Sequence, residues 1–198
     1  MLMAMHPPGF PITMPLLVGA TLRLRELTED DIPSWFERAT DRASADLAGD
    51  PVPVAIEAGA AWLQRHRARF RNGLGLRWAI VPKDGTVSVG TVGLAFEPGI
   101  AASAELGIVV ARSCWGRGIG TTATCMVVDY AFAELGLAEV RAVVLQRNHA
   151  SVRLLEKSGF SRLEVVPPTA AEPEVLLRYA RTRRGAEGVR ERPTRSVT

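Results

Sequence analysis

The stretch that decides the fold runs from residue 104 to residue 121 and reads AELGIVVARSCWGRGIGT. Its first seven residues are mostly apolar and rich in valine, which predicts a buried strand. Gly116, Gly118 and Gly120 follow at alternate positions, and residues 119–135 then repeat apolar side chains with the period of a helix. Such a glycine-rich turn lets the backbone approach a ligand closely, and the free N–H groups and dipole of the helix start favour an anion. The stretch therefore predicts a phosphate or pyrophosphate site, with a turn that serves packing alone as the alternative.

Hydrophobic periodicity elsewhere in the chain predicts an α/β (α+β) fold with a mixed central β-sheet flanked by helices. Strands are expected at residues 21–27, 77–81, 87–96, 104–110, 139–145, 160–166 and 174–179. Helices are expected after Thr28 and at residues 56–70, 119–135 and 150–158. The resulting order, β-α-α-β-β-β-α-β-α-β-β, places hairpins early in the chain and crossover helices late.

Length and composition limit the classes of protein that fit. The 198 residues, 47% hydrophobic and 23% charged, match one globular domain with a real core. Cys114 and Cys125 are too few for a disulfide scaffold, and no apolar run approaches the roughly 18 residues of a membrane span. The first 15 residues hold four prolines and no basic residue, unlike a secretory signal. Collagen, coiled coil, membrane channel and disulfide knot are excluded, and we expect a cytoplasmic protein.

The net charge of +3 is distributed unevenly along the chain. Residues 178–198 hold seven arginines and two glutamates, a net charge of +5, whereas the rest of the chain has a net charge of −2. This asymmetry argues against a nucleic-acid-binding fold and leaves only a possible contact between the tail and RNA. We expect a flexible N-terminal extension at residues 1–20, one domain at residues 21–181 and a basic disordered tail at residues 182–198.

Two common phosphate-binding motifs do not fit the glycine-rich turn. The dinucleotide fingerprint needs glycine at position 121, where Thr121 stands, and the Gly-Lys-Ser/Thr of a P-loop does not follow the glycines. Residues 115–121, W-G-R-G-I-G-T, instead resemble the Q/R-x-x-G-x-G/A signature of the GCN5-related N-acetyltransferases (GNAT). Trp115 in the first position departs from that signature but matches the RimJ/RimL-type subgroup, whose turn reads W-G-K/R-G-x-A/G.

A second segment carries the same resemblance. Residues 146–160 are similar to the family element N-x-x-S-x-R-x-L-E-K-x-G-F, and they lie at the expected distance after the turn. The resemblance covers residues 21–180, which is most of the chain. It implies the GNAT fold, whose central sheet is splayed at the acetyl-CoA site.

The resemblance also implies which residues hold acetyl-CoA, the co-substrate of the family, between strands 104–110 and 139–145. The exposed backbone of Val109 and Val110 would pair with the pantetheine arm and polarise the thioester carbonyl. The residues whose backbone amides would hold the pyrophosphate are Trp115, Gly116, Arg117, Gly118, Ile119, Gly120 and Thr121. Arginine side chains match phosphate oxygens well. The cations that could neutralise the phosphates are Arg112, Arg117, Arg147 and Lys157, with Arg117 favoured because it lies inside the turn.

Asn148 and Ser151 lie at the start of the helix expected at residues 150–158. Asn148 is expected to cap that helix. The resemblance further implies that Asn148 contacts the pantetheine arm and that Ser151 lies near the CoA sulfur. Many members of the superfamily place a tyrosine acid where Glu156 stands here. Protonation of the leaving thiolate therefore falls to Ser151, to water or to no group at all, since a thiol has a pKa of about 8.5.

Glu105 is the candidate general base. Strand alternation places its side chain on one face with Gly107 and Val109, beside the expected thioester. An edge or solvent-facing glutamate without a catalytic role is the alternative. Neutralising an α-amine, with a pKa of about 8, asks less of a base than neutralising a lysine, with a pKa of about 10.4.

Other residues that invite a functional interpretation are assigned to structure. The cysteines and His149 lack a third residue that would orient a nucleophile, and the histidines lack metal-ligand spacing, so we expect no metal. Trp35, Trp62 and Trp78 are expected in or near the core, and the first two lie on helices that wall the acceptor pocket in the resembled fold.

The reaction implied is transfer of acetyl from acetyl-CoA to a primary amine by direct attack on the thioester. The RimJ/RimL resemblance favours the N-terminal α-amine of a protein or peptide. Two alternatives remain: a small-molecule amine such as an amino sugar or polyamine, and a non-catalytic acyl-CoA sensor. A homodimer is possible, and no membrane partner is expected.

Overall fold

The structure is a computed structural model that describes residues 7–48, 51–100, 102–170 and 173–183. Its strands are β1 (Leu17–Val18), β2 (Leu22–Glu26), β3 (Gly75–Pro82), β4 (Gly90–Ala95), β5 (Ser103–Val110), β6 (Glu139–Leu145), β7 (Ser161–Val166) and β8 (Leu176–Thr182). Its α-helices are α1 (Ile32–Thr40), α2 (Arg42–Ala48), α3 (Ala58–Arg71), α4 (Ile119–Ala133) and α5 (His149–Lys157). Short 3-10 turns precede α1 and follow β5.

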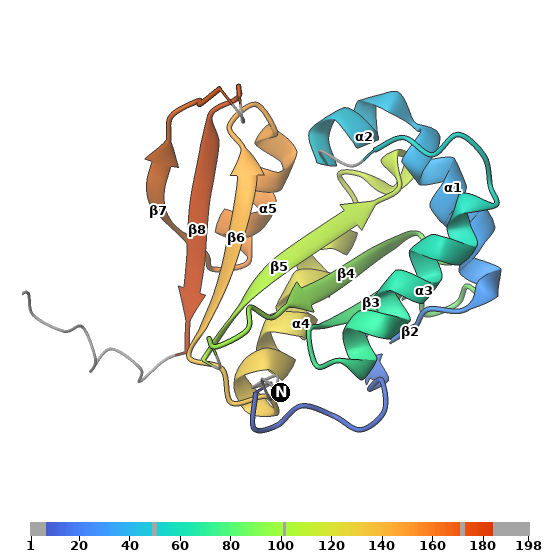
Figure 1. The fold of residues 1–198 in the computed structure, drawn as a ribbon, viewed down its shortest axis with the longest axis horizontal. Coiled ribbons are helices and arrows are strands. Elements are labelled where there is room, and N and C mark those ends of the chain that lie inside the picture. Colours follow the sequence, from blue (N-terminus) through green and yellow to red (C-terminus); the bar gives the residue numbers. More distant parts are fainter. Residues whose placement is uncertain (1–6, 49–50, 101, 171–172, 184–198) are drawn as a thin grey trace, which may run out of the picture.

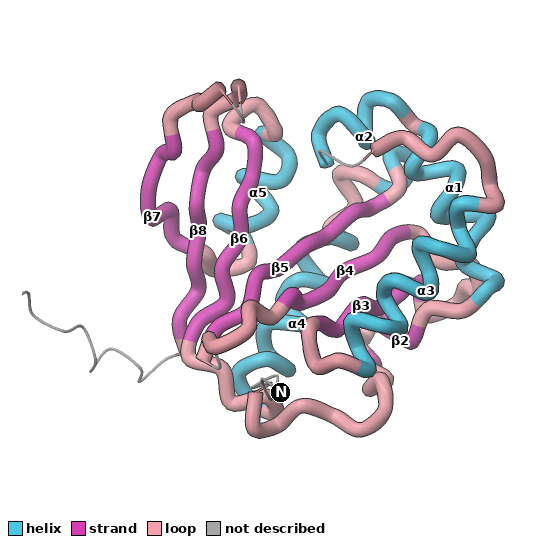
Figure 2. The backbone as a smooth tube through the Cα atoms, in the orientation of Figure 1, coloured by secondary structure: helices cyan, strands magenta, loops and turns pink. Residues whose placement is uncertain are grey.

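The described strands form one sheet in the order β1-β2-β3-β4-β5-β6-β8-β7. Every neighbouring pair is antiparallel except β5 and β6, which run parallel. This parallel pairing covers only Ser103–Glu105 and Glu139–Arg141, and beyond it the two strands separate, as Figures 1 and 2 show. The mixed, splayed sheet predicted from the sequence is confirmed.

Helices cover both faces of the sheet. Alternate residues of β3 point to opposite faces, so Trp78 and Ile80 pack in the larger core with α4, whereas Ala79 and Val81 pack with Trp62 of α3. All four of these β3 side chains are fully buried. The two cores hold α4 against one face and α1 with α3 against the other, so the end of β5 emerges between two helical layers (Figure 1).

Two described segments differ from the sequence-based expectations. Part of the expected flexible extension packs on the domain: β1 pairs with β2, the Phe10 ring stacks on Phe70 at 5.5 Å, and the Trp78 indole N–H donates to the Pro15 carbonyl at 2.7 Å. Helix α2 was not expected at all, and its position beside the carboxyl end of β5 matters for the site (Figure 1). Residues 1–6 and 184–198, the latter most of the expected basic tail, lie outside the described residues.

The longest of the described helices is α4, with 15 residues. None of those in the described residues is long and apolar enough to cross a membrane.

Candidate active site

The separation of β5 from β6 opens a cleft of about 250 Å³ between the end of β5 and the starts of α4 and α5. The structure brings almost all the predicted cofactor-binding residues together around it. Those that line the cleft are Val109, Val110, Trp115, Gly116, Gly118, Ile119, Gly120, Thr121, Asn148 and Ser151. Arg117, the remaining predicted residue, is exposed and is not among the lining residues.

The register of β4 and β5 decides which backbone groups face this cleft. Thr91 pairs with Val109, and the Ala111 N–H donates to the Val89 carbonyl at 2.8 Å. Because hydrogen-bonded pairs alternate in antiparallel strands, the Val109 backbone bonds to β4, while Ile108 and Val110 direct their backbone groups toward the opening. Val109 and Val110 were the residues expected to pair with the pantetheine arm. The Val110 backbone does face the opening, whereas that of Val109 does not, and Ile108 faces the opening in its place.

The Trp115 side chain accounts for the unusual first position of the turn motif. Its indole N–H donates to the Val110 carbonyl at 2.8 Å. The indole therefore occupies an acceptor at the end of β5 and fixes the start of the turn on that strand. A glutamine amide or an arginine guanidinium in the same position would offer a comparable N–H donor.

The three alternate glycines serve two different purposes. Gly116 and Gly118 adopt positive φ angles of 74° and 76°, which L-residues with a side chain rarely adopt, and Gly118 caps α4. Gly120 lies within the helix, and a Cβ there would be 2.5 Å from the Leu154 side chain. Two glycines therefore shape the turn, while the third lets α4 pack closely against α5.

The start of α5 forms the opposite wall of the cleft. The Asn148 carboxamide oxygen accepts a hydrogen bond from the Ser151 N–H at 3.1 Å, which confirms the predicted helix cap, and its amide donates to the Leu47 carbonyl at 3.4 Å. Arg153 and Lys157, one helical turn apart, also line the cleft. Arg153 was missed in the sequence because nothing distinguishes it from a surface charge until α5 is placed.

Two of the arginines proposed for phosphate are engaged elsewhere. Arg147 forms ion pairs with Asp46 of α2 at 2.6 Å and with Glu174 before β8. Arg112 lies 3.8 Å from Asp41. These pairs join α2 to segments that flank the cleft, so they help to place that helix.

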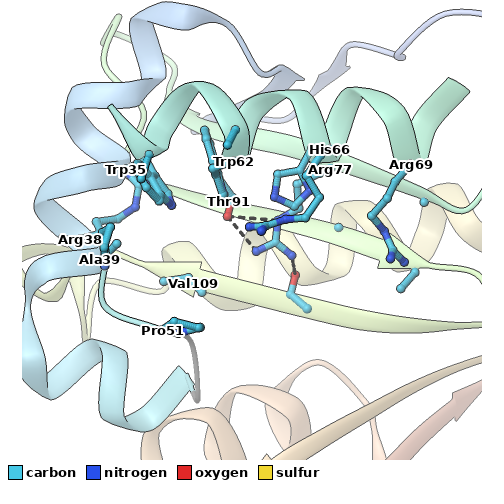
Figure 3. Close-up of a pocket in the computed structure, with 18 of the residues that line it drawn as sticks. Trp35, Arg38, Ala39, Pro51, Trp62, His66, Arg69, Arg77, Thr91 and Val109 are labelled. Carbon is cyan, nitrogen blue, oxygen red and sulfur yellow. Dashed lines mark hydrogen bonds between the residues drawn. The ribbon is translucent and has the colours of Figure 1, made fainter. Parts of the chain in front are cut away.

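A second cavity, of about 690 Å³ and larger than the cleft, lies on the face of β3, β4 and β5 that α1 and α3 cover (Figure 3). We call it the acceptor groove, lined by residues of α1, α2 and α3 and of these strands. Glu105, Gly107 and Val109 all line it, as strand alternation predicts. Val109 and Ser44 line both cavities, so the groove and the cleft adjoin at the end of β5.

Aromatic rings form one wall of the acceptor groove. Trp35 and Trp62 stack with ring centroids 5.1 Å apart, and His66 packs edge-on against Trp62 at 5.3 Å. Both tryptophans line the groove, whereas Trp78 is fully buried in the core. The lining role considered for the first two is therefore the one that the structure supports.

The charges in the acceptor groove are mostly positive. Among the described residues that line it, Glu105 is the one acidic residue. The basic residues are Arg38, Arg65, His66, Arg69 and Arg77. Burial, followed by the charges of Arg77, Arg65 and Arg69, lowers the pKa of His66 to about 3, so this imidazole is neutral at pH 7. This cluster could not be predicted from the sequence, because its members come from two helices and a strand.

The remaining candidate groups contribute less. The Tyr179 hydroxyl donates to the Glu156 carboxylate at 3.2 Å, and neither residue lines the cleft. Cys114 is buried at the cleft wall as a free thiol. Within the described part of the chain, no group of three or more histidine, cysteine, aspartate or glutamate side chains is placed to hold a metal ion.

Comparison with known proteins adds independent findings. A family model described as the acetyltransferase (GNAT) domain matches residues 21–161. The chain is 30% identical over 148 residues to the uncharacterized N-acetyltransferase YoaA of Bacillus subtilis (strain 168), an alignment that covers 75% of this chain and 84% of YoaA.

Two solved structures show how far the fold is shared. RimJ of Mycobacterium smegmatis, solved in complex with CoA-disulfide, superimposes with a TM-score of 0.74 and 27% identity over 90% of each chain. Spermidine N-acetyltransferase of Vibrio cholerae, solved with CoA and spermine, gives a TM-score of 0.71 and 19% identity over 83% of this chain and 96% of that one. At that identity, the second likeness concerns the fold alone.

Proposed function

This chain belongs to the GNAT acetyltransferase family, and from that premise we propose that its acceptor is the N-terminal α-amine of a protein or peptide. The family match confirms the GNAT resemblance that the two sequence motifs indicated. The enzyme is an N-acetyltransferase that uses acetyl-CoA as its co-substrate. When bound, acetyl-CoA supplies the thioester carbonyl that the acceptor amine attacks.

The residues around the cleft fit this co-substrate. The turn at residues 116–121 presents the N-terminus of α4, where backbone N–H groups and the helix dipole favour a pyrophosphate. The backbone of Ile108 and Val110 faces an opening in the sheet, which suits an extended chain bearing amide groups, as the pantetheine arm does. Arg153 and Lys157 add positive charge for the phosphates.

We assign the proton transfers to residues on both sides of β5. Glu105 lies three residues before Ile108, roughly 10 Å along the strand, so it would take the proton of the amine through a relay of waters in the acceptor groove. One N–H group on this edge of β5, that of Ile108 or that of Val110, would polarise the thioester carbonyl. Ser151, which lines the cleft, is the hydroxyl we assign to the leaving sulfur, with water as the alternative donor.

The observation that carries the proposed acceptor is the pair of adjoining cavities. The cleft has a volume of only about 250 Å³, whereas the groove of about 690 Å³ has room for several residues of a peptide. Both reach Val109, so an amine that enters from the groove meets the edge of β5. The likeness to RimJ, at 27% identity, supports the same choice.

The experiment is incubation with acetyl-CoA and a mixed panel of peptides, polyamines and amino sugars, followed by mass spectrometry. We expect one acetyl group on the α-amine of a peptide and none on a matched peptide whose N-terminus is blocked but which contains lysine. Acetylation of a small amine in preference to every peptide would overturn the proposed acceptor. Tight CoA binding without turnover on any amine would favour the sensor instead.

A further inference from the structure

The acceptor groove carries more positive than negative charge, and from this we infer that the enzyme selects acidic N-termini, with carboxylates in the residues that follow the acetylated amine. This inference rests on the proposed function, because it specifies which N-termini enter the groove. It also separates peptides from polyamines, which carry the opposite charge. Three features of the groove support it.

Arg38 of α1 offers a buried donor that has no partner among the described residues. The residue is 7% exposed and lines the groove. One of its terminal nitrogens donates to the Ser88 carbonyl at 3.3 Å, while the other is buried and has no hydrogen-bond partner among the described residues. The nearby carboxylate of Asp31 is instead paired with Arg25 at 2.7 Å. Since a buried, unpaired guanidinium N–H is unfavourable, an oxygen of a bound acceptor would satisfy it.

Arg77 of β3 lies across the floor of the groove. Its register places it beside Gly93 of β4, which in turn pairs with Gly107 of β5. The guanidinium donates to the Thr91 hydroxyl at 2.9 Å and to the Gly107 carbonyl at 3.1 Å (Figure 3). A Cβ at Gly93 or Gly107 would lie 2.7 or 3.0 Å from this side chain, so the two glycines make room for it.

The arginines of α3 differ according to the direction in which they point. Arg67, which does not line the groove, pairs with Glu29 at 2.7 Å. Arg65 and Arg69 do line it, and neither forms an ion pair with a carboxylate in the described part of the chain. Arg69 donates to the neutral Leu74 carbonyl at 3.0 Å. Among the described residues, the charges of Arg65 and Arg69 are thus not neutralised by a carboxylate, whereas that of Arg67 is.

These features divide the groove into two functions. Glu105 is the one acidic residue among the described residues that line the groove, and it would bind the ammonium of the acceptor. The guanidinium groups at Arg38, Arg65, Arg69 and Arg77 would then bind carboxylates further along the same peptide. A polyamine, which carries several positive charges and no carboxylate, would be repelled by the same four groups.

The test compares peptides that differ only in charge. Three peptides begin with alanine and continue with two glutamates, two glutamines or two lysines, and spermidine is included as the polyamine. We expect kcat/KM to fall in that order, with the acidic peptide at least about tenfold above the basic one and no turnover of spermidine. The ratio should shrink at high salt, because salt screens partly exposed charges.

Variants identify the residues responsible. Arg65→Gln and Arg69→Gln should each lower the acidic-to-basic ratio by roughly three- to tenfold. Gly107→Ala should lower it less, because its Cβ, 3.0 Å from the Arg77 guanidinium, shifts that group without removing its charge. Arg71→Gln is the matched control, since Arg71 is exposed on α3 and does not line the groove, and it should leave the ratio as in the wild type.

The outcomes separate this inference from the proposed function. Peptide acetylation without a preference for acidic residues, or with a preference that none of the three variants changes, would overturn the inference and keep the proposed function. Acetylation of small carboxylate-bearing amines alone would overturn the proposed peptide acceptor, and of the inference it would keep only the preference of the groove for carboxylates. Efficient turnover of spermidine would overturn both.

Discussion

The cofactor cleft and the acceptor groove lie on either side of the end of β5, yet they are built from different parts of the chain. The cleft takes most of its lining from one stretch at residues 108–121 and from α5, and that stretch presents the N–H groups at the start of α4. The acceptor groove takes side chains from three helices and three strands. We infer that cofactor recognition depends on the shape of a local stretch of backbone, whereas the choice of acceptor depends on side chains that are dispersed in the sequence. Substitutions in the cleft should therefore change CoA binding, and substitutions in the groove should change the choice of acceptor.

The sharpest test of this separation is Glu105→Gln. We expect kcat/KM to fall by about a hundredfold or more, because the amide does not accept the proton of the acceptor ammonium. The affinity for CoA should stay as in the wild type, since Glu105 lines the groove and not the cleft. Glu134→Gln, at an exposed position near the end of α4, is the matched control. A kcat/KM near that of the wild type for Glu105→Gln would show that Glu105 is not the general base.

Stability should depend on pH through His66 of the groove but not through His149, an exposed residue that lines neither cavity. His66 in the groove has a pKa lowered to about 3 by burial and by the neighbouring arginines, whereas an unfolded histidine titrates near 6.5. Between these values the unfolded chain binds more protons, so the free energy of unfolding falls as the pH falls, by at most about 1.4 kcal/mol per pH unit.

Denaturant unfolding between pH 7 and pH 4 measures this slope. His66→Gln should flatten it, while His149→Gln, an exposed position at the start of α5, should leave it unchanged. Equal slopes in the wild type and the His66 variant would show that the imidazole is not held neutral in the groove.

The cleft can be tested with two glycines that share the same positive-φ backbone conformation. Gly118 and Gly136 have φ angles of 76° and 69°, and a Cβ at either would meet nothing within 4 Å. Alanine should therefore cost each site a similar free energy of unfolding, about 1 kcal/mol. Only Gly118→Ala should weaken CoA binding, by roughly tenfold in calorimetry, because only Gly118 lines the cleft. Equal CoA affinities in the two variants would contradict the backbone character of this site.

The smallest effect is expected at Arg38, where function opposes stability. Burial lowers the pKa of Arg38 to about 10, and one of its buried N–H groups has no partner in the described residues. Arg38→Met should raise the free energy of unfolding by about 1 kcal/mol and lower kcat/KM for the acidic peptide. A loss of stability would show that Arg38 serves the fold instead of the acceptor. Arg71→Met, at an exposed position on the adjacent helix, should change neither quantity measurably.

The same contrast explains what the sequence could predict. The strand expected at residues 139–145 coincides with β6, and the helix expected from residue 119 begins where α4 begins, because both depend on local periodicity and glycine. Helix α2 was missed because it is held by distant partners: Arg147 pairs with Asp46, and Asn148 donates to the Leu47 carbonyl. Contacts between residues about a hundred positions apart leave no local signal.

The site shows a finer limit of sequence-based prediction. Alternation alone placed Glu105, Gly107 and Val109 on one face, and the structure agrees. It did not decide which of Ile108 and Val109 offers its backbone to the cleft, because that depends on the register with β4. The basic character of the groove was equally hidden, since its arginines are combined only by folding.

The most direct test is a crystal structure with a bisubstrate analogue, in which CoA is joined through its acetyl group to the α-nitrogen of an acidic peptide. We expect the pyrophosphate at the backbone amides of residues 116–121 and the linkage beside Ile108 and Val110. The peptide should then run into the acceptor groove, with its carboxylates at Arg38 and Arg77. A peptide that leaves the cleft in another direction, with the groove unoccupied, would contradict the account.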